Sequence, residues 1–325
     1  HVELVSLLRD ATQGGGVAEL QPGEEVMKRL GASFFLTLIL CTALSAAEPP
    51  KAVVPHLQNI SVTIKAGRSE GSGVLYVRDN QCFVWTAAHV VDGLRSTRKV
   101  VDPKTGTQKT IVEFSDAKVV KTLIESGRTV GRFELDAQVL KYSDATHGED
   151  LAILRVRAKN QFKEGVTFYD GDKPPILGTR LYHVGSLLGE VGSGSLTDGI
   201  VSQHGRLIGK TIFDQTNATS FPGSSGGGIY LAGKGTYVGM LVRGAGEGFS
   251  LYVPVRRMRR WARATKVEWA MNPKVPLPAE KEMGGIPIED IGKRGWKVEA
   301  TTTIYGHVFG KTKILQRRPR LAIPE

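Results

Sequence analysis

Cysteine is scarce in this chain of 325 residues, which contains only Cys41 and Cys82. Two thiols cannot form a disulfide framework, but the length allows a sizeable hydrophobic core instead. The sequence also lacks an amphipathic helical pattern of any length between Ser61 and Val255. Its histidines show no paired spacing with Cys, Asp or Glu of the kind that binds metal ions, so we expect no metal site and no cofactor.

Positive charge is plentiful but unevenly spread over a net charge of +11. Between Arg256 and Glu325 there are 16 Lys and Arg against 7 Asp and Glu, so the basicity belongs mainly to the C-terminal part. Such a tail suits an anionic membrane surface, a cell-wall polymer or an acidic partner, and the alternative is a solvated tail without a ligand. Nucleic acid is not an expected partner, because the N-terminal part indicates export.

The run Met27–Ala47, MKRLGASFFLTLILCTALSAA, has the layout of a secretory signal peptide. It has a basic start, an apolar centre and small residues at its end, and we expect cleavage after Ala46 or Ala47. The alternative is an uncleaved membrane anchor, which the short apolar run disfavours. Residues 1–26 are then expected to be an upstream extension of the reading frame. These features predict export from a bacterial cell, into the periplasm or beyond.

From Ser61 onward, short apolar runs alternate with glycine-containing turns. Examples are GSGVLYVRD, CFVWTAAHVV, DLAILRVR and TYVGMLV. This spacing predicts an all-β fold built as antiparallel barrels or a sandwich. Apolar residues then recur at helical spacing from Val255, which predicts a helix over 255–270, and the proline-rich stretch Asn272–Pro287 is typical of a linker.

Two residues could serve as the base and its orienting group in acyl transfer. His89 follows two small alanines at the end of an apolar strand, where its ring has room; the alternative is a core histidine bonded to a carbonyl. Asp150 stands just before the apolar run LAILRV, where we expect a half-buried carboxylate at a barrel edge. The alternative for Asp150 is an ordinary aspartate at a turn.

The stretch SFPGSSGGG supplies the candidate nucleophile, Ser225. A glycine- and serine-rich run is often a linker, but here the strand-like IYLAG follows at once. The glycines permit positive φ angles, so the backbone N–H groups of Gly223 and Ser225 can point into one concavity. Ser224 is the weaker candidate, because it has a glycine on one side only.

The blocks TAAH, DLAIL and PGSSGG resemble the three signature blocks of trypsin-like serine endopeptidases. The bacterial HtrA/Deg type is the most similar, because HVGSLLGEVGSGSLTDGIVSQHGR and GFSLYVPV resemble segments of that family. The resemblance implies two six-stranded antiparallel barrels over about 55–165 and 176–255, closed by the helix at 255–270. The protease domain would span 53–270, followed by a basic tail at 271–325 that is short for a PDZ domain.

The resemblance also implies a role for each candidate residue. His89 would be the general base, Asp150 its orienting partner and Ser225 the nucleophile that attacks polypeptide substrates. The amides of Gly223 and Ser225 would form the oxyanion hole. The strand edge that pairs with the substrate backbone would consist of Val242, Arg243 and Gly244.

Alignment with the family places Thr219 at the base of the primary specificity pocket, with Gly244 and Gly248 on its walls. No carboxylate stands at that base, and an arginine or lysine entering it would lose hydration without gaining an ionic partner. The pocket therefore predicts small to medium aliphatic side chains before the cut. Glu247 carries the alternative, because it would supply a negative charge if its loop turned inward.

The sequence departs from the family pattern in several places. Ser224 replaces an Asp or Asn, so activation by insertion of a new N-terminus is not expected. Cys82 has no partner near the candidate base. The 61 residues between His89 and Asp150 include the basic run RSTRKVVDPKTGTQKT, which predicts a long excursion. Trimers are common in the resembled family, but no residue of this chain indicates an oligomer.

Two other functions compete with the protease. The motif Gly223-x-Ser225-x-Gly227 also fits the nucleophile elbow of α/β-hydrolase esterases, with Asp290 and His307 following in the order of that family. An elbow requires a helix right after the serine, whereas the residues here favour a strand. The second alternative is a catalytically silent trypsin-fold protein that serves as a binding module.

Overall fold

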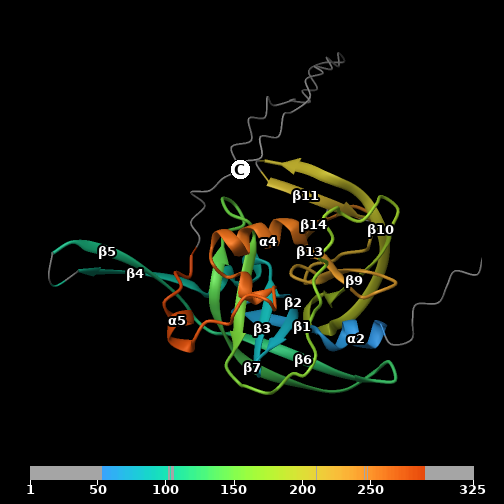
Figure 1. The fold of residues 1–325 in the computed structure, drawn as a ribbon. Coiled ribbons are helices and arrows are strands. Elements are labelled where there is room, and N and C mark those ends of the chain that lie inside the picture. The colour runs from blue at the N-terminus through green and yellow to red at the C-terminus, as the bar shows by residue number, and fades with distance from the viewer. Residues whose placement is uncertain are drawn as a thin grey trace, which may run out of the picture. The chain divides into compact units, whose positions relative to one another are not determined.

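The computed structural model describes residues 53–101, 103, 106–209, 211–244, 246 and 248–289 (Figure 1). The expected signal peptide at 27–47, the preceding residues 1–26, Glu247 and the tail from 290 onward lie outside this range. Within the described part, no helix has the length and apolar character needed to span a membrane.

The first barrel is closed and antiparallel, with strand order β1-β2-β3-β8-β7-β6. Its strands are β1 (Ser61–Ala66), β2 (Ser69–Arg78), β3 (Gln81–Thr86), β6 (Ala117–Glu125), β7 (Arg128–Ser143) and β8 (Leu151–Val156). The apolar runs of β3 and β8 pair directly, with Trp85 opposite Ile153, and both residues are fully buried. Because the inward side chains fill the barrel, its interior is a packed core and not a channel.

The second barrel is also closed, with strand order β10-β11-β14-β13-β12-β9. Its strands are β9 (Arg180–Leu187), β10 (Gly192–Ile208), β11 (Thr211–Thr216), β12 (Gly228–Leu231), β13 (Tyr237–Gly244) and β14 (Ser250–Pro254). The two barrels confirm the expected all-β fold of six-stranded antiparallel barrels. They also make the esterase alternative wrong, because the strand β12 and no helix follows Ser225.

The basic run after His89 forms a hairpin of its own, consisting of β4 (Arg95–Val101) and β5 (Gln108–Phe114). The hairpin extends away from the first barrel in Figure 1. The long excursion expected between His89 and Asp150 is therefore a two-stranded sheet.

Helices are short and lie between or after the barrels. The α-helices are α2 (Val53–Asn59), α3 (Ala88–Val91), α4 (Val255–Ala264) and α5 (Glu280–Gly284), and the 3-10 turns are η1 (Asp92–Leu94), η2 (Gly189–Val191) and η3 (Glu268–Ala270). The helix expected over 255–270 thus ends at Ala264, because Lys266 adopts a left-handed φ of 62°. Helix α4 packs Trp261 against Trp85 of β3, with ring centroids 5.9 Å apart.

The stretch expected to be a linker, residues 272–287, packs against the core instead. Met283 of α5 is 2% exposed, and Val275, Leu277 and Ile286 contact the same core. The four prolines prevented a regular element from being predicted here, but they do not prevent burial of the apolar side chains between them.

Candidate active site

His89 lies in α3, directly after β3 and the small residues Ala87 and Ala88. Its ring Nδ1 is 3.0 Å from each carboxylate oxygen of Asp150, and its backbone N–H donates to Oδ1 of Asp150 at 3.2 Å. Because a carboxylate only accepts, Nδ1 carries the proton and Nε2 is left to accept one. The side chain of His89 is 37% exposed, so this second nitrogen can be reached from outside.

Asp150 stands immediately before β8 and adopts a left-handed φ of 55°, which is uncommon for a residue other than glycine. Its side chain is 3% exposed, so it is almost fully enclosed and not half-buried as expected. A buried carboxylate without partners would be costly, and the two N–H groups of His89 provide partners. The enclosure fixes the carboxylate, and through it the orientation of the imidazole ring.

Two consecutive tight turns form the loop around Ser225. The N–H of Ser224 donates to the carbonyl of Phe221 at 2.9 Å, and the N–H of Gly227 donates to the carbonyl of Ser224 at 3.0 Å. Among the described residues, the amides of Gly223 and Ser225 have no acceptor. The loop therefore leaves unbonded the two amides expected to hold an oxyanion.

Two glycines of this loop are required by the backbone. Gly223 has a φ of 93°, and a Cβ atom there would lie 2.3 Å from the carbonyl oxygen of Ser186. Gly226 has a φ of 90°, and its Cβ would lie 2.1 Å from the carbonyl oxygen of Ser72. Only glycine fits positions that combine this conformation with such close backbone neighbours.

Ser72 of β2 ties the first barrel to this loop, a role that the sequence analysis missed. Its N–H donates to the carbonyl of Ser225 and its hydroxyl donates to the carbonyl of Gly223, both at 2.7 Å. The same hydroxyl accepts the N–H of Ser186 at 2.7 Å. The available signal was a serine between two glycines, Gly71 and Gly73, in an otherwise apolar strand.

The hydroxyl of Ser225 and the ring of His89 belong to adjacent segments but share no direct hydrogen bond in the described structure. The hydroxyl of Ser225 donates to the carbonyl of Val242 at 3.5 Å. Gly71 lies between the segments, since a Cβ there would be 3.1 Å from the carbonyl of Ser225 and 2.5 Å from Val90, the neighbour of His89. Hydrogen bonds of this kind are often long without substrate and shorten when it binds.

The expected substrate edge is open on one side. Strand β13 pairs with β14 as far as Gly244, whereas its pairing with β12 ends at Met240, opposite Gly228. Beyond that point, Val242 is buried, and Arg243 and Gly244 are exposed. These residues thus form an unpaired strand edge that begins beside Ser225, and a substrate strand can add to such an edge.

The specificity pocket differs in detail from the sequence expectation. Thr219 is exposed, and the side chain nearest to Gly244 is that of Ser220, whose hydroxyl would be 2.4 Å from a Cβ at Gly244. The hydroxyls of Ser220 and Ser250 lie 2.9 Å apart. Gly248 is exposed with open space around it. Neutral hydroxyls therefore lie next to the glycine wall, and the sequence analysis did not identify them.

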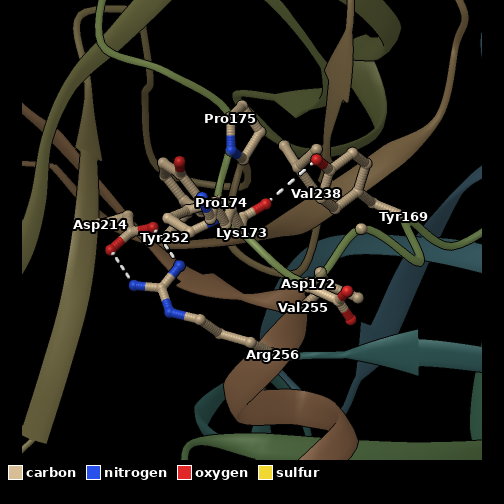
Figure 2. Close-up of a pocket in the computed structure, with 11 residues that line it drawn as sticks. Tyr169, Asp172, Lys173, Pro174, Pro175, Asp214, Val238, Tyr252, Val255 and Arg256 are labelled. Atoms are coloured by element: carbon tan, nitrogen blue, oxygen red, sulfur yellow. Dashed lines mark hydrogen bonds and ion pairs between the residues drawn. The ribbon is translucent and has the colours of Figure 1, made fainter.

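A separate cavity lies elsewhere on the second barrel and contains none of the expected site residues (Figure 2). Its walls include the paired side chains of Asp214 and Arg256, together with Tyr252 and the prolines Pro174 and Pro175. Within the described part of the chain, no cluster of His, Cys, Asp and Glu side chains is suited to hold a metal ion.

Comparison with protein families decides the class of the molecule. The trypsin-like peptidase domain matches residues 71–240, which is more than half of the chain. The chain belongs to this family. A search among curated proteins found no match.

Solved structures similar to this trypsin-like chain include two proteases. An inactive serine-to-alanine mutant of Rv3671c from M. tuberculosis H37Rv has 18% identity and a TM-score of 0.47, and the match covers 71% of this chain and 98% of that one. The HtrA-type protease AlgW, also as a serine-to-alanine variant and with a tripeptide, has 22% identity and a TM-score of 0.48, with 67% of this chain and 64% of that one covered.

Proposed function

We propose that the protein is a serine endopeptidase that cleaves polypeptides through His89, Asp150 and Ser225. The observation that carries the proposal is the pair of unbonded amides at Gly223 and Ser225. A silent binding module would have no need to keep two donors free beside a serine, since unbonded amides lower stability wherever they are shielded from water. Membership of the trypsin-like peptidase family supports the same class of activity.

The proposed reaction divides into acylation and deacylation. The hydroxyl oxygen of Ser225 attacks the substrate carbonyl carbon while Nε2 of His89 takes its proton, and Asp150 stabilises the imidazolium. The amides of Gly223 and Ser225 bind the resulting oxyanion. Collapse of the intermediate breaks the C–N bond, and His89 gives its proton to the departing amine. Water, deprotonated by His89, then attacks the acyl-enzyme and releases the acid and Ser225.

Export remains a second part of the proposal, and it rests on Met27–Ala47. Cys82, the thiol of the described region, is buried, and burial raises its pKa well above the ordinary range, so it stays protonated and unreactive. A protein without a reactive thiol suits an oxidising compartment. Mass spectrometry of the mature N-terminus tests the export: a start at or near residue 48 is expected, and recovery of residues 1–26 would contradict it.

A fluorophosphonate probe tests the catalytic assignment. We expect covalent labelling of the wild type and none of Ser225→Ala, with casein cleavage reduced about a million-fold, as for a measured serine protease, and thermal stability nearly unchanged. Ser224→Ala is the control: its hydroxyl is 1% exposed and accepts the N–H of Phe221, so the variant should lose some stability and keep its labelling. Casein cleavage by Ser225→Ala within tenfold of wild type would end the proposal.

The same assay with paired peptides tests the specificity. Because the hydroxyls of Ser220 and Ser250 are uncharged, we propose cleavage after small to medium aliphatic residues such as Val or Ala. Faster turnover of peptides with Arg or Lys at this position would contradict that. Loss of the basic preference in Glu247→Gln would identify the residue responsible.

A further inference from the structure

Arg257 of α4 is a buried cation next to the candidate catalytic carboxylate. It is 3% exposed, and three of its nitrogens donate hydrogen bonds. Nε bonds to the carboxylate of Glu149, Nη2 to the backbone carbonyl of Glu149 at 2.8 Å, and Nη1 to the carbonyl of Ile212 at 3.0 Å. Its guanidinium carbon also lies 4.9 Å from the ring centroid of Phe213. A cation so enclosed holds its partners in one arrangement, because losing any of them leaves a buried charge unpaired.

The carbonyl that Arg257 holds belongs to the peptide unit that leads into Asp150. A peptide unit is planar, so the carbonyl of Glu149 and the N–H of Asp150 move together. The φ angle of Asp150 sets how this plane lies relative to the carboxylate that contacts His89, and its value of 55° is in the left-handed region. A left-handed aspartate persists only where its surroundings fix it.

The other contacts of this turn are neutral. The N–H of Glu149 donates to the hydroxyl of Ser143 at 2.9 Å, and the N–H of Asp150 reaches the carbonyl of Asp144 at 3.3 Å. Among the described residues, the guanidinium of Arg257 is the charged donor on the Glu149 peptide. Charge-assisted, multiply bonded contacts of arginine are stronger and more directional than neutral ones.

We propose that Arg257 is a positioning residue that clamps Glu149 and thereby keeps Asp150 aimed at His89. The inference rests on the proposed protease function. It assigns to helix α4, from the C-terminal end of the second barrel, control over a catalytic group of the first barrel. Phe213 extends the connection, because its ring also lies 5.1 Å from the guanidinium carbon of Arg243 on the substrate edge.

The test compares Arg257→Gln with Arg256→Gln, its neighbour on the same helix. Arg256 forms a doubly bonded ion pair with Asp214 and makes no contact with the Glu149 turn in the described structure, so its loss controls for removal of a buried-carboxylate partner from α4. We expect Arg257→Gln to lower kcat by about 10²-fold, the scale of an ångström-sized misplacement, with KM changed far less. Arg256→Gln should keep kcat near wild type.

A second readout separates positioning from general loss of structure. The proton on Nδ1 of His89 gives a low-field NMR resonance when it bonds to a carboxylate, and this resonance reports the hydrogen bond whether or not the protein turns over substrate. It should shift or disappear in Arg257→Gln and stay in Arg256→Gln. If Arg257→Gln does not fold, Glu149→Gln decides, because it removes the carboxylate and keeps the carbonyl; its loss of kcat should be smaller but above that of Arg256→Gln.

Equal kcat and an unchanged resonance in the folded Arg257 variant, or in Glu149→Gln where that variant is needed, would overturn the inference. Failure of the proposed function would look different, since the wild type itself would then take up no fluorophosphonate. A resonance that still responds to Arg257 in an unlabelled protein would support the clamp and reject the protease.

Discussion

The two barrels contribute to the candidate site in different ways. The first barrel supplies side chains: the ring of His89 and the carboxylate of Asp150 contact each other at 3.0 Å. The second barrel supplies backbone: apart from the hydroxyl of Ser225, its contribution is the amides of Gly223 and Ser225, set by positive φ angles. Functional groups of one half thus depend on residue type, and those of the other half depend on main-chain conformation.

This difference predicts different sensitivities to substitution. A side-chain group is lost when its functional atoms change, even if the shape is kept. A backbone group survives most side-chain changes and is lost when the chain path shifts. Isosteric substitution in the first barrel and a single added methyl group in the second therefore probe the same comparison from opposite sides.

Asp150→Asn should give the largest effect of this set. The amide keeps the shape of the carboxylate but favours the wrong tautomer of His89 and cannot stabilise an imidazolium, so we expect kcat to fall by about 10⁴-fold. Steady-state kinetics on a peptide substrate measure this. The control is Asp144→Asn, in the same turn region, whose carboxylate bonds to the N–H groups of Thr146 and His147. Similar losses in both variants would mean that Asp150 has only a structural role.

Gly223→Ala should give the next largest effect. The added methyl group would meet the carbonyl of Ser186 at 2.3 Å, so the loop must move and take the Gly223 amide with it. Losing one oxyanion donor costs about 10²- to 10³-fold in kcat. Gly67→Ala is the matched control, because Gly67 also has a positive φ, 63°, but open space around it. Equal activity in the two variants would contradict the backbone assignment.

The same division decides how much of the molecule the sequence could predict. The all-β class, the hairpin after His89 and the pairing of His89 with Asp150 follow from apolar periodicity and from residue type. The contacts of Ser72 and of Arg257 could not be predicted, because each joins segments more than 100 residues apart in sequence. The packing of residues 272–287 was also missed, since burial of irregular chain leaves no periodic pattern.

Histidine allows one more comparison between the barrels, because His183 of β9 is the buried counterpart of the accessible His89. His183 is 0% exposed, and its Nδ1–H donates to the carbonyl of Gly228 at 3.2 Å. Its ring also approaches Gly227, two residues after Ser225, where a Cβ would lie 2.6 Å from Cε1. Burial lowers the pKa of His183 to about 4 from an ordinary value of 6.5. The neutral ring is therefore part of the fold that supports the nucleophile loop.

The lowered pKa predicts how stability depends on pH. Above pH 6.5 the ring is neutral in both the folded and the unfolded chain, so its stabilising contribution is complete. Between pH 6.5 and 4 the unfolded chain binds a proton that the folded chain does not, so the free energy of unfolding falls, by about 3 kcal/mol in total. Below pH 4 this group has no further effect.

Urea unfolding at pH 7, 5.5 and 4 measures this dependence. His183→Gln should be less stable than wild type at pH 7, because a flexible amide fills the buried site less well, but its stability should fall less steeply with acid. His147→Gln is the control, since the His147 side chain is 84% exposed, and its variant should follow the wild-type curve. An acid dependence in His183→Gln as steep as in wild type would show that other groups control acid stability, and His183 would then be a packing residue whose charge state does not matter.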